Sequence, residues 1–301
     1  MWFKNLKLYA LTQTLDIVDT DLEDKLAEFR FRPCGSQDLA TMGFSSPMNG
    51  GKNLVHATGG RIWLTLKKQE RILPAAVVNA ELAEKVAQIE AETGSSVGKK
   101  AQQDLKQEII HRLLPQAFTK NSFTHGFISA KDNLVVVDAS ADGKAEAFLA
   151  MLRKAIGSLP VVPLARQSVQ NHLTAWLQEQ QAPADVVILE EAELKAFDEA
   201  GAVIRCKNQD LSSDEMLNHL QSGKLVQKLA IEWDETFSAL IQEDLTIKRV
   251  KFTDMLREQN DDIPKDDALA RLDANFALMS GEIVRFSQRL IEMFELQQDG
   301  E

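Results

Sequence analysis

Hydrophobic residues recur with helical spacing between positions 99 and 114. Four apolar residues appear there, one at every fourth position: Ala101, Leu105, Ile109 and Leu113. This stripe predicts an amphipathic helix that buries one face and stops at Pro115. Lys99 and Lys106 are about two helical turns apart, so they share a second, basic face. Alone, the pattern fits an ordinary helix with a solvated face, and only its context gives the basic face a further meaning.

The rest of the chain mixes short β patterns with helical ones. Strands are predicted over residues 2–11, 54–58, 61–67, 122–130, 134–139, 186–189, 202–206, 224–233, 236–242 and 246–252. Helices are predicted over residues 19–31, 74–93, 143–156, 168–180, 190–199, 212–221 and most of the last fifty residues. Gly59-Gly60 turns the first hairpin, and a turn-rich segment at 32–38 leads into a loop through Gly51. Hairpins mixed with helices, without a regular βαβ rhythm, predict the α+β fold class.

These elements group into three predicted regions. Residues 1–53 and 140–200 form a central α+β region. Residues 54–139 form a basic region with the order hairpin, helix, helix, hairpin. Residues 201–301 form a second α+β region that ends in acidic helices.

Charge is distributed unevenly along the chain. The net charge is −11, which argues against nucleic acid as a partner because most nucleic-acid binders are basic. Residues 52–131 hold 12 basic and 7 acidic residues, a net charge of +5, so the remainder carries −16. A basic segment inside an acidic protein favours a confined anion-binding surface, with non-specific binding limited elsewhere.

The sequence predicts a reduced cytosolic protein. No apolar run approaches the ~20 residues that cross a bilayer. Lys4, Asn5 and Lys7 interrupt the apolar N-terminus, and no small-residue cleavage site follows, so no signal peptide is expected. The two cysteines, Cys34 and Cys206, lie far apart in the sequence, which favours free thiols.

Signatures of an enzyme are sparse. The five histidines show no metal-ligand spacing with one another or with the cysteines. Cys34 lies in a tight turn without an activating neighbour, and Gly59-Gly60 is not followed by the Gly-Lys-Ser/Thr of a phosphate loop. We therefore expect no catalytic residue, no bound metal and no cofactor.

Two acidic groups leave a metal-dependent nuclease as an alternative. One group could hold Mg²⁺ but is more typical of a solvated helix start: Asp261, Asp262, Asp266 and Asp267. The strand at 186–189 followed by Glu193 and Lys195 resembles the metal-and-lysine arrangement of some nucleases. Both residues lie in a predicted helix, however, and no partner aspartate is evident.

Binding of duplex DNA has better support, because spaced lysines and arginines suffice to contact a line of phosphates. The chain has no recognition-helix signature, zinc-finger spacing or ribonucleoprotein aromatics, so contacts should not depend on base sequence. The predicted phosphate-facing residues are Lys67, Lys68, Arg71, Lys99, Lys100, Lys106, Arg112, Lys120 and Lys131. Weaker candidates in the second half are Lys207, Lys224 and Lys228.

Phe118 follows the helix-ending Pro115 by three residues. It can close the local core, or it can insert into a partner subunit, since aromatic residues are enriched at interface hot spots. We predict the second role, as an anchor of a homodimer interface.

Five segments resemble a known family. They are Pro33-Cys-Gly-Ser-Gln-Asp38, Arg71-Ile-Leu-Pro74, Leu113-Leu-Pro-Gln-Ala-Phe118, Leu152-Arg-Lys-Ala-Ile-Gly-Ser-Leu-Pro-Val-Val-Pro-Leu164 and Leu278-Met-Ser-Gly-Glu282. They closely resemble the RdgC family of bacterial recombination-associated proteins, and the resemblance covers essentially the whole chain. It implies a ring-shaped homodimer that encircles duplex DNA without sequence preference, associates with the nucleoid and restrains RecA-promoted recombination. A nuclease is the alternative, and a protein-interaction adaptor that does not bind DNA is the third possibility.

Overall fold

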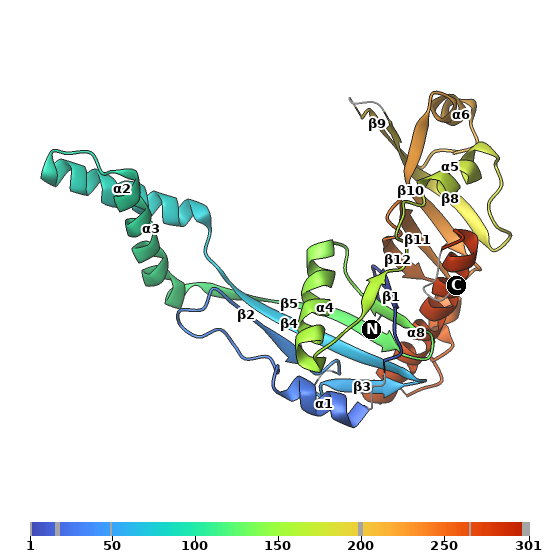
Figure 1. The fold of residues 1–301 in the computed structure, drawn as a ribbon, viewed down its shortest axis with the longest axis horizontal. Coiled ribbons are helices and arrows are strands. Elements are labelled where there is room, and N and C mark those ends of the chain that lie inside the picture. The colour runs from blue at the N-terminus through green and yellow to red at the C-terminus, as the bar shows by residue number, and fades with distance from the viewer. Residues whose placement is uncertain (1, 16–18, 49, 198–200, 265, 297–301) are drawn as a thin grey trace. The chain divides into compact units, whose positions relative to one another are not determined.

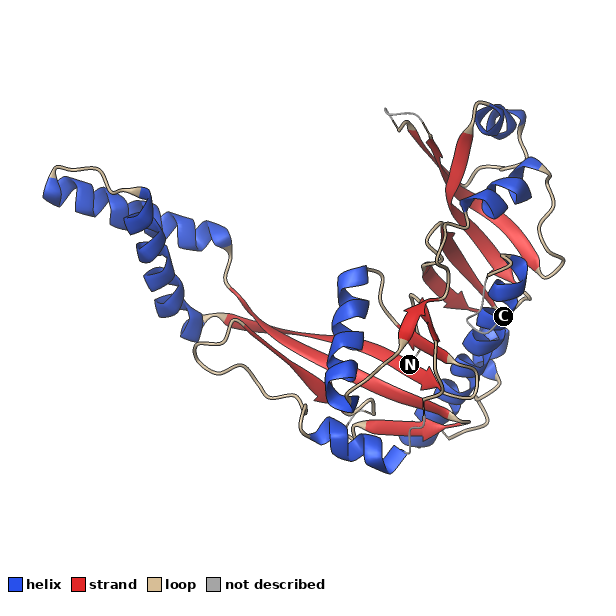
Figure 2. Cartoon of the chain, in the orientation of Figure 1, coloured by secondary structure: helices blue, strands red, loops and turns tan. Residues whose placement is uncertain are grey.

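The computed structural model describes residues 2–15, 19–48, 50–197, 201–264 and 266–296. These residues form two compact units. Unit 1 contains residues 1–28, 46–65 and 124–301, and unit 2 contains residues 29–45 and 66–123. Figures 1 and 2 show helices and strands in both units, and the predicted α+β class is confirmed. The three-region division stays a prediction.

Two antiparallel sheets organise the chain. The first has the strand order β2-β4-β5-β6-β1-β7, with β3 added on β4, and the second has the order β12-β11-β10-β8-β9. The first sheet contains β1 (Lys7–Leu11), β2 (Ala40–Ser45), β3 (Val55–Thr58), β4 (Arg61–Ile72), β5 (Phe118–Ser129), β6 (Leu134–Val137) and β7 (Val161–Pro163). The second contains β8 (Val186–Ala196), β9 (Val203–Lys207), β10 (Lys224–Trp233), β11 (Phe237–Gln242) and β12 (Ile247–Phe252). The boundary between the units falls inside β4 and β5.

Helices cover both faces of the first sheet within unit 1. All four residues of β6 are buried, as expected for a strand covered on both faces. On one face, α4 (Asp142–Ile156) packs so closely that a Cβ on Gly126 would lie 2.7 Å from the Phe148 ring. On the other face, Phe127 contacts Phe276 of α8 (Ala268–Met293). Because neighbouring residues of a strand face opposite ways, Gly126 and Phe127 together set both layers.

The same helix, α8, packs on the second sheet of unit 1. Phe286 contacts Trp233 of β10 and Phe237 of β11. Two shorter helices in this part of the chain are α5 (Gln170–Gln178) and α6 (Asp214–Gln221). Trp176 of α5 stacks on Phe294, just beyond the end of α8. One long amphipathic helix therefore supplies apolar side chains to both sheets. Figure 1 shows the path of α8 along them.

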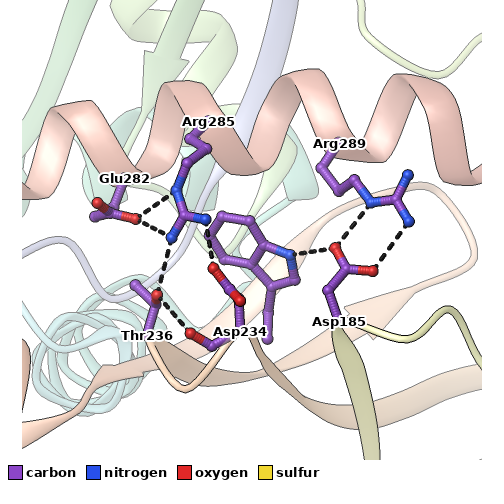
Figure 3. Close-up of polar contacts among 7 residues, drawn as sticks. Asp185, Asp234, Thr236, Glu282, Arg285 and Arg289 are labelled. Atoms are coloured by element: carbon purple, nitrogen blue, oxygen red, sulfur yellow. Dashed lines mark hydrogen bonds and ion pairs between the residues drawn. The ribbon is translucent and has the colours of Figure 1, made fainter.

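Charged side chains fix α8 to the second sheet (Figure 3). Arg289 donates from Nε and Nη2 to the two carboxylate oxygens of Asp185, at 2.8 and 3.0 Å. The indole of Trp233 donates to the same carboxylate at 3.1 Å. The Arg289 hydrogen bonds, with help from Trp233, lower the pKa of Asp185 to about 2. One turn earlier, Arg285 lies 4.3 Å from the Trp233 ring centroid and pairs with Asp234.

The N-terminal strand joins the two sheets. Its start forms a bridge to the second sheet, where the Leu6 N–H donates to the Ile247 carbonyl at 2.7 Å. From Lys7 onward it pairs with β6, and from Tyr9 onward also with β7. Lys7 adds ion pairs to Asp142 at 2.5 Å and to Asp244 at 3.1 Å.

Unit 2 is built on the far ends of β4 and β5. It contains β2, the helices α2 (Ala75–Thr93) and α3 (Lys99–Leu113), and a short 3₁₀ turn, η1 (Leu114–Gln116). Gly94 ends α2 with a φ of 63°, a left-handed conformation that favours glycine. Two ion pairs join the helices: Lys85 contacts Glu108 at 2.6 Å, and Arg112 contacts Glu81.

Most sequence-predicted elements are confirmed. The helix that begins at Lys99 runs to Leu113, and the last three predicted strands correspond to β10, β11 and β12. The Gly59-Gly60 hairpin is present, with φ of 59° and 75°. The C-terminal helix is α8, although residues 297–301 lie outside the described part of the chain.

Three predictions of local structure are wrong. Residues 190–196 are not a helix but continue β8, because pairing with β10 and β9 overrides the helix preference of that segment. The predicted end of that helix, 198–200, is not described. The predicted loop through Gly51 contains β2, and β5 begins at Phe118, inside the predicted connection.

Candidate nucleic-acid interface

The two units differ in charge. Unit 2 holds 11 basic and 8 acidic residues, a net charge of +3. The whole chain carries −11, so unit 1 carries −14. Nine of the twelve cations of the predicted basic segment lie in the smaller unit, together with all seven of its acidic residues.

The N-terminus of α3 carries the clearest cationic group. Lys99 and Lys100 are its first two residues, and both are exposed. The preceding residue, Gly98, provides no side-chain cap, and the first turn contains no acidic residue. The unpaired N–H groups of this turn and the helix dipole therefore add to the charge of the two ammonium groups. Lys106 follows about two turns later and is half-buried.

Five predicted contacts keep their charge without a carboxylate partner. Among the residues that the structure describes, no acidic group lies within ion-pair distance of Lys99, Lys100, Lys106, Lys120 or Lys131. Lys120 lies in β5, and Lys131 lies in the exposed turn between β5 and β6, in unit 1. An anionic ligand would be the counterion that these groups lack.

Other predicted contacts are already paired. Lys68 lies 2.8 Å from Glu70, and Arg112 pairs with Glu81 of α2. Each of these cations would exchange a carboxylate for a phosphate, which reduces the gain from binding DNA.

Lys67 and Arg71 face a different side of β4 from Lys68. Lys67 lies 4.3 Å from the Phe31 ring centroid and 5.7 Å from that of Phe123 on β5. Arg71 donates to main-chain carbonyls of unit 2. Successive side chains of a strand point to opposite faces, so Lys68 lies on the reverse face of the ribbon. Of the three basic residues, Lys68 is the one not held by aromatic rings or carbonyls.

Phe118 is 83% exposed, so it does not close a local core. Ile72, at the end of β4, and Leu39, before β2, are 46% and 61% exposed. The Leu39 carbonyl accepts from the Arg71 N–H at 2.8 Å, which places Leu39 beside the end of β4. These three residues form what we call the apolar edge of unit 2. The role of Phe118 in a dimer interface stays a prediction.

The weaker candidates of unit 1 lie on the second sheet, in β9 and β10. Lys207 is 3.9 Å from Glu191, and Lys228 is 2.8 Å from Glu193. Lys224 donates to the hydroxyl of Ser222 at 2.9 Å. Two of these three cations therefore have an acidic neighbour.

Sequence reasoning missed two cations that lie on the same surface of the second sheet as Lys207 and Lys228. Arg205 pairs with Glu193 at 2.7 Å, and Arg249 pairs with Glu191 at 2.9 Å. Together with Lys207 and Lys228 they line a groove of about 310 Å³, and we call the surface formed by these four cations, Glu191 and Glu193 the β8–β9 face. The period-two spacing of Arg205 and Lys207 was the available signal, since it places both on one face of β9. Arg249 gave no such signal because its position depends on the pairing of β12.

The acidic groups considered for a nuclease have other partners. Asp261 pairs with Arg271 at 3.0 Å, and Asp267 caps α8 by accepting from the Ala270 N–H at 3.0 Å. Glu193 lies in a strand and contacts two cations. Within the described ranges, no three His, Cys, Asp or Glu side chains are grouped to hold a metal ion.

Two further expectations concerned free thiols and membrane-spanning segments. Cys34 and Cys206 are free thiols, and Cys206 is buried. None of the helices in the described part of the chain is both long and apolar enough to cross a bilayer.

The sequence was compared with known protein families and proteins. Residues 1–297 match a family profile described as "Putative exonuclease, RdgC". A recombination-associated protein RdgC of Pseudoalteromonas atlantica is 75% identical over 301 residues, covering 100% of both chains. Proteins of the same name from Aeromonas hydrophila and Psychromonas ingrahamii are 47% and 45% identical, with 95% and 98% of both chains covered.

Proposed function

Because this chain belongs to the RdgC family of recombination-associated proteins, we propose that it binds duplex DNA without sequence preference. It acts as a homodimer that closes into a ring around the duplex. By occupying the duplex in the nucleoid, it restrains RecA-promoted recombination. It performs no catalysis and needs no cofactor.

The cations of α3 are the observation that carries this proposal. Lys99 and Lys100 project from an uncapped helix N-terminus, and Lys106 lies on the same helix without a carboxylate partner in the described chain. Duplex DNA presents about one negative charge per 1.7 Å of axis, so such a group meets several phosphates in any sequence. Phosphate contacts position a protein on DNA but do not read bases.

The distribution of charge and apolar surface supports the ring. A net charge of −14 on unit 1 disfavours DNA on most of its surface, whereas unit 2 carries +3. The apolar edge of unit 2 exposes an aromatic residue and two aliphatic ones. Aromatic residues with apolar neighbours are typical of the centre of a protein interface, and a second copy is the proposed occupant.

Replacement of the α3 lysines tests the proposal. Lys99→Ala, Lys100→Ala and Lys106→Ala are combined, and binding to two unrelated duplexes is measured by fluorescence anisotropy over a range of salt concentrations. Removing one phosphate-binding cation lowers the magnitude of the log–log salt slope by about 0.9, so the slope of the triple variant should be smaller by about 2.7 for each protomer, or about 5.4 for the homodimer. The decrease in affinity should be equal on both duplexes.

A matched variant controls for net charge. Lys25→Ala, Lys144→Ala and Lys251→Ala remove the same charge from exposed positions of unit 1 and should leave the slope nearly unchanged. An unchanged slope in the α3 variant would refute its contact with phosphates. Mg²⁺ added to wild-type protein with end-labelled duplex tests the alternative, because shortened products would establish a nuclease.

A further inference from the structure

A segment of unit 2 lies along one face of β4 and is held by three alternating side chains. We call residues 31–37 the strap. Lys67 lies over the Phe31 ring, Gln69 accepts from the Cys34 N–H at 2.8 Å, and Arg71 donates to the Gly35 carbonyl at 2.9 Å. This period-two series places all three β4 side chains on the strap side of the ribbon.

Arg71 connects the strap to a third segment. Its Nη1 donates to the carbonyls of Pro115 and Ala117, at 3.3 and 3.1 Å, while Nη2 holds Gly35. Its Nε is buried and meets no acceptor among the residues that the structure describes. One guanidinium thus joins the strap, η1 and the start of β5. Only the planar fork of arginine reaches three acceptors in these directions, and a lysine ammonium does not reproduce it.

The segments that Arg71 joins carry the apolar edge. Ala117 directly precedes Phe118, so the bond to its carbonyl fixes the main chain from which that exposed ring projects. The main-chain N–H of Arg71 holds the Leu39 carbonyl, and Ile72 is the next residue of β4. Each residue of the apolar edge is therefore tied to Arg71. Phe118 follows a residue bonded to its guanidinium, Leu39 is bonded to its main chain, and Ile72 is its neighbour in β4.

We propose that Arg71 is a positioning residue for the apolar edge, and not a phosphate contact. Its guanidinium orders the strap and the Pro115–Ala117 main chain, so that Phe118 projects in the conformation that the second copy receives. This inference rests on the proposed homodimer for the identity of the partner. The ordering of the two segments does not depend on it.

Two variants separate positioning from charge. Arg71→Lys keeps the positive charge and removes the fork, and Arg71→Gln removes both. Phe118→Ala is the reference for a disrupted interface, and Lys25→Ala, at an exposed position of unit 1, is the matched control for loss of one charge. For each protein we would measure the dimer dissociation constant by sedimentation, the salt slope of DNA binding, and hydrogen exchange of peptides covering residues 33–38 and 115–119.

Positioning predicts that the Lys and Gln variants behave alike. Exchange should rise in both peptides while α2 and α3 stay protected, and the dimer dissociation constant should rise about tenfold, because the charge-assisted hydrogen bonds are absent. At protein concentrations that restore the dimer, the salt slope of both variants should equal that of wild type.

Three results would overturn the inference. One is a normal Lys variant beside a Gln variant whose salt slope falls by about 0.9 for each protomer, which identifies a phosphate contact. Another is unchanged exchange in both peptides. The third is unfolding of all of unit 2 in both variants, which identifies a general stabilising residue. If wild type is itself monomeric, the proposed dimer fails, and the exchange measurement still decides whether Arg71 orders the two segments.

Discussion

The cations of α3 and the cations of the β8–β9 face carry the same formal charges in different surroundings. Lys99, Lys100 and Lys106 have no carboxylate partner in the described chain. On the second sheet, Glu191 and Glu193 each contact two cations. The first group is available to an external anion, whereas in the second group two carboxylates offset half the charge of four cations. Charge content alone therefore does not identify a binding surface, and the partner of each charge does.

The ion pairs of α8 extend this comparison. Arg285 and Arg289 also have carboxylate partners, and they fix a helix that packs on both sheets of unit 1. These cations serve the fold. Removing them should lower stability, whereas removing the α3 lysines should lower DNA affinity and leave stability nearly unchanged.

Topology provides the largest expected effect on DNA binding. If the dimer encloses DNA, its escape from a closed circle requires the ring to open, whereas on linear DNA it can slide off an end. We expect retention on relaxed circles to outlast retention on linear DNA of equal sequence, when both are challenged with salt and competitor. Blocking the linear ends should restore the long lifetime.

A basic patch on one side of the duplex gives a different result. It would show equal lifetimes on the circle, the open linear DNA and the blocked linear DNA, because phosphate contacts do not sense the ends. Equal lifetimes would therefore reject stable enclosure and leave a surface contact through α3.

Neutralising Glu191 and Glu193 should leave the cations of the β8–β9 face without carboxylate partners, like the lysines of α3. Glu191→Gln combined with Glu193→Gln frees the paired cations of the β8–β9 face. If this face lines the DNA path, the salt slope should steepen by about 2 for each protomer, close to 0.9 for each carboxylate removed. Anisotropy titrations measure the change.

The control for this variant removes equal charge elsewhere. Glu146→Gln in α4 and Glu179→Gln at the end of α5 change exposed residues and should leave the slope close to wild type. Equal slopes for both double variants would place the β8–β9 face away from DNA.

The smallest expected effect is on the pH dependence of stability. It tests the Asp185 carboxylate, a charge that stabilises the fold. The folded-state pKa of Asp185 is lowered to about 2 from 3.8, so its stabilising effect is complete above pH 4 and disappears as the pH falls toward 2. Asp185→Asn should lower the free energy of unfolding by about 1–2 kcal/mol at pH 7, after allowance for solvent screening.

Denaturant unfolding of both proteins at several pH values measures this difference. The deficit of the Asn variant should shrink between pH 4 and pH 2, because the same interaction then disappears from wild type. A deficit that is constant over this range would show that the Arg289–Asp185 pair contributes no pH-dependent stability.

The sequence determined the elements whose pattern is local. The stripe from Ala101 to Leu113 specified the helix α3, although Ile109 is its one buried member and Ala101 is exposed. Gly59-Gly60 specified a hairpin because both residues adopt positive φ. The concentration of positive charge and the family were also readable, since both depend only on residue identity and order.

Tertiary structure alone decided the features that depend on distant partners. Residues 190–196 became a strand because β10 and β9 provide hydrogen bonds on both sides, which no local preference encodes. The same holds for the cations. Lys228 and Lys106 are both lysines, and the sequence does not distinguish their surroundings. In the structure Glu193 lies beside Lys228, and no carboxylate of the described chain lies beside Lys106. Ion pairs form over a few ångströms between residues far apart along the chain, so only the folded chain determines which charges stay available.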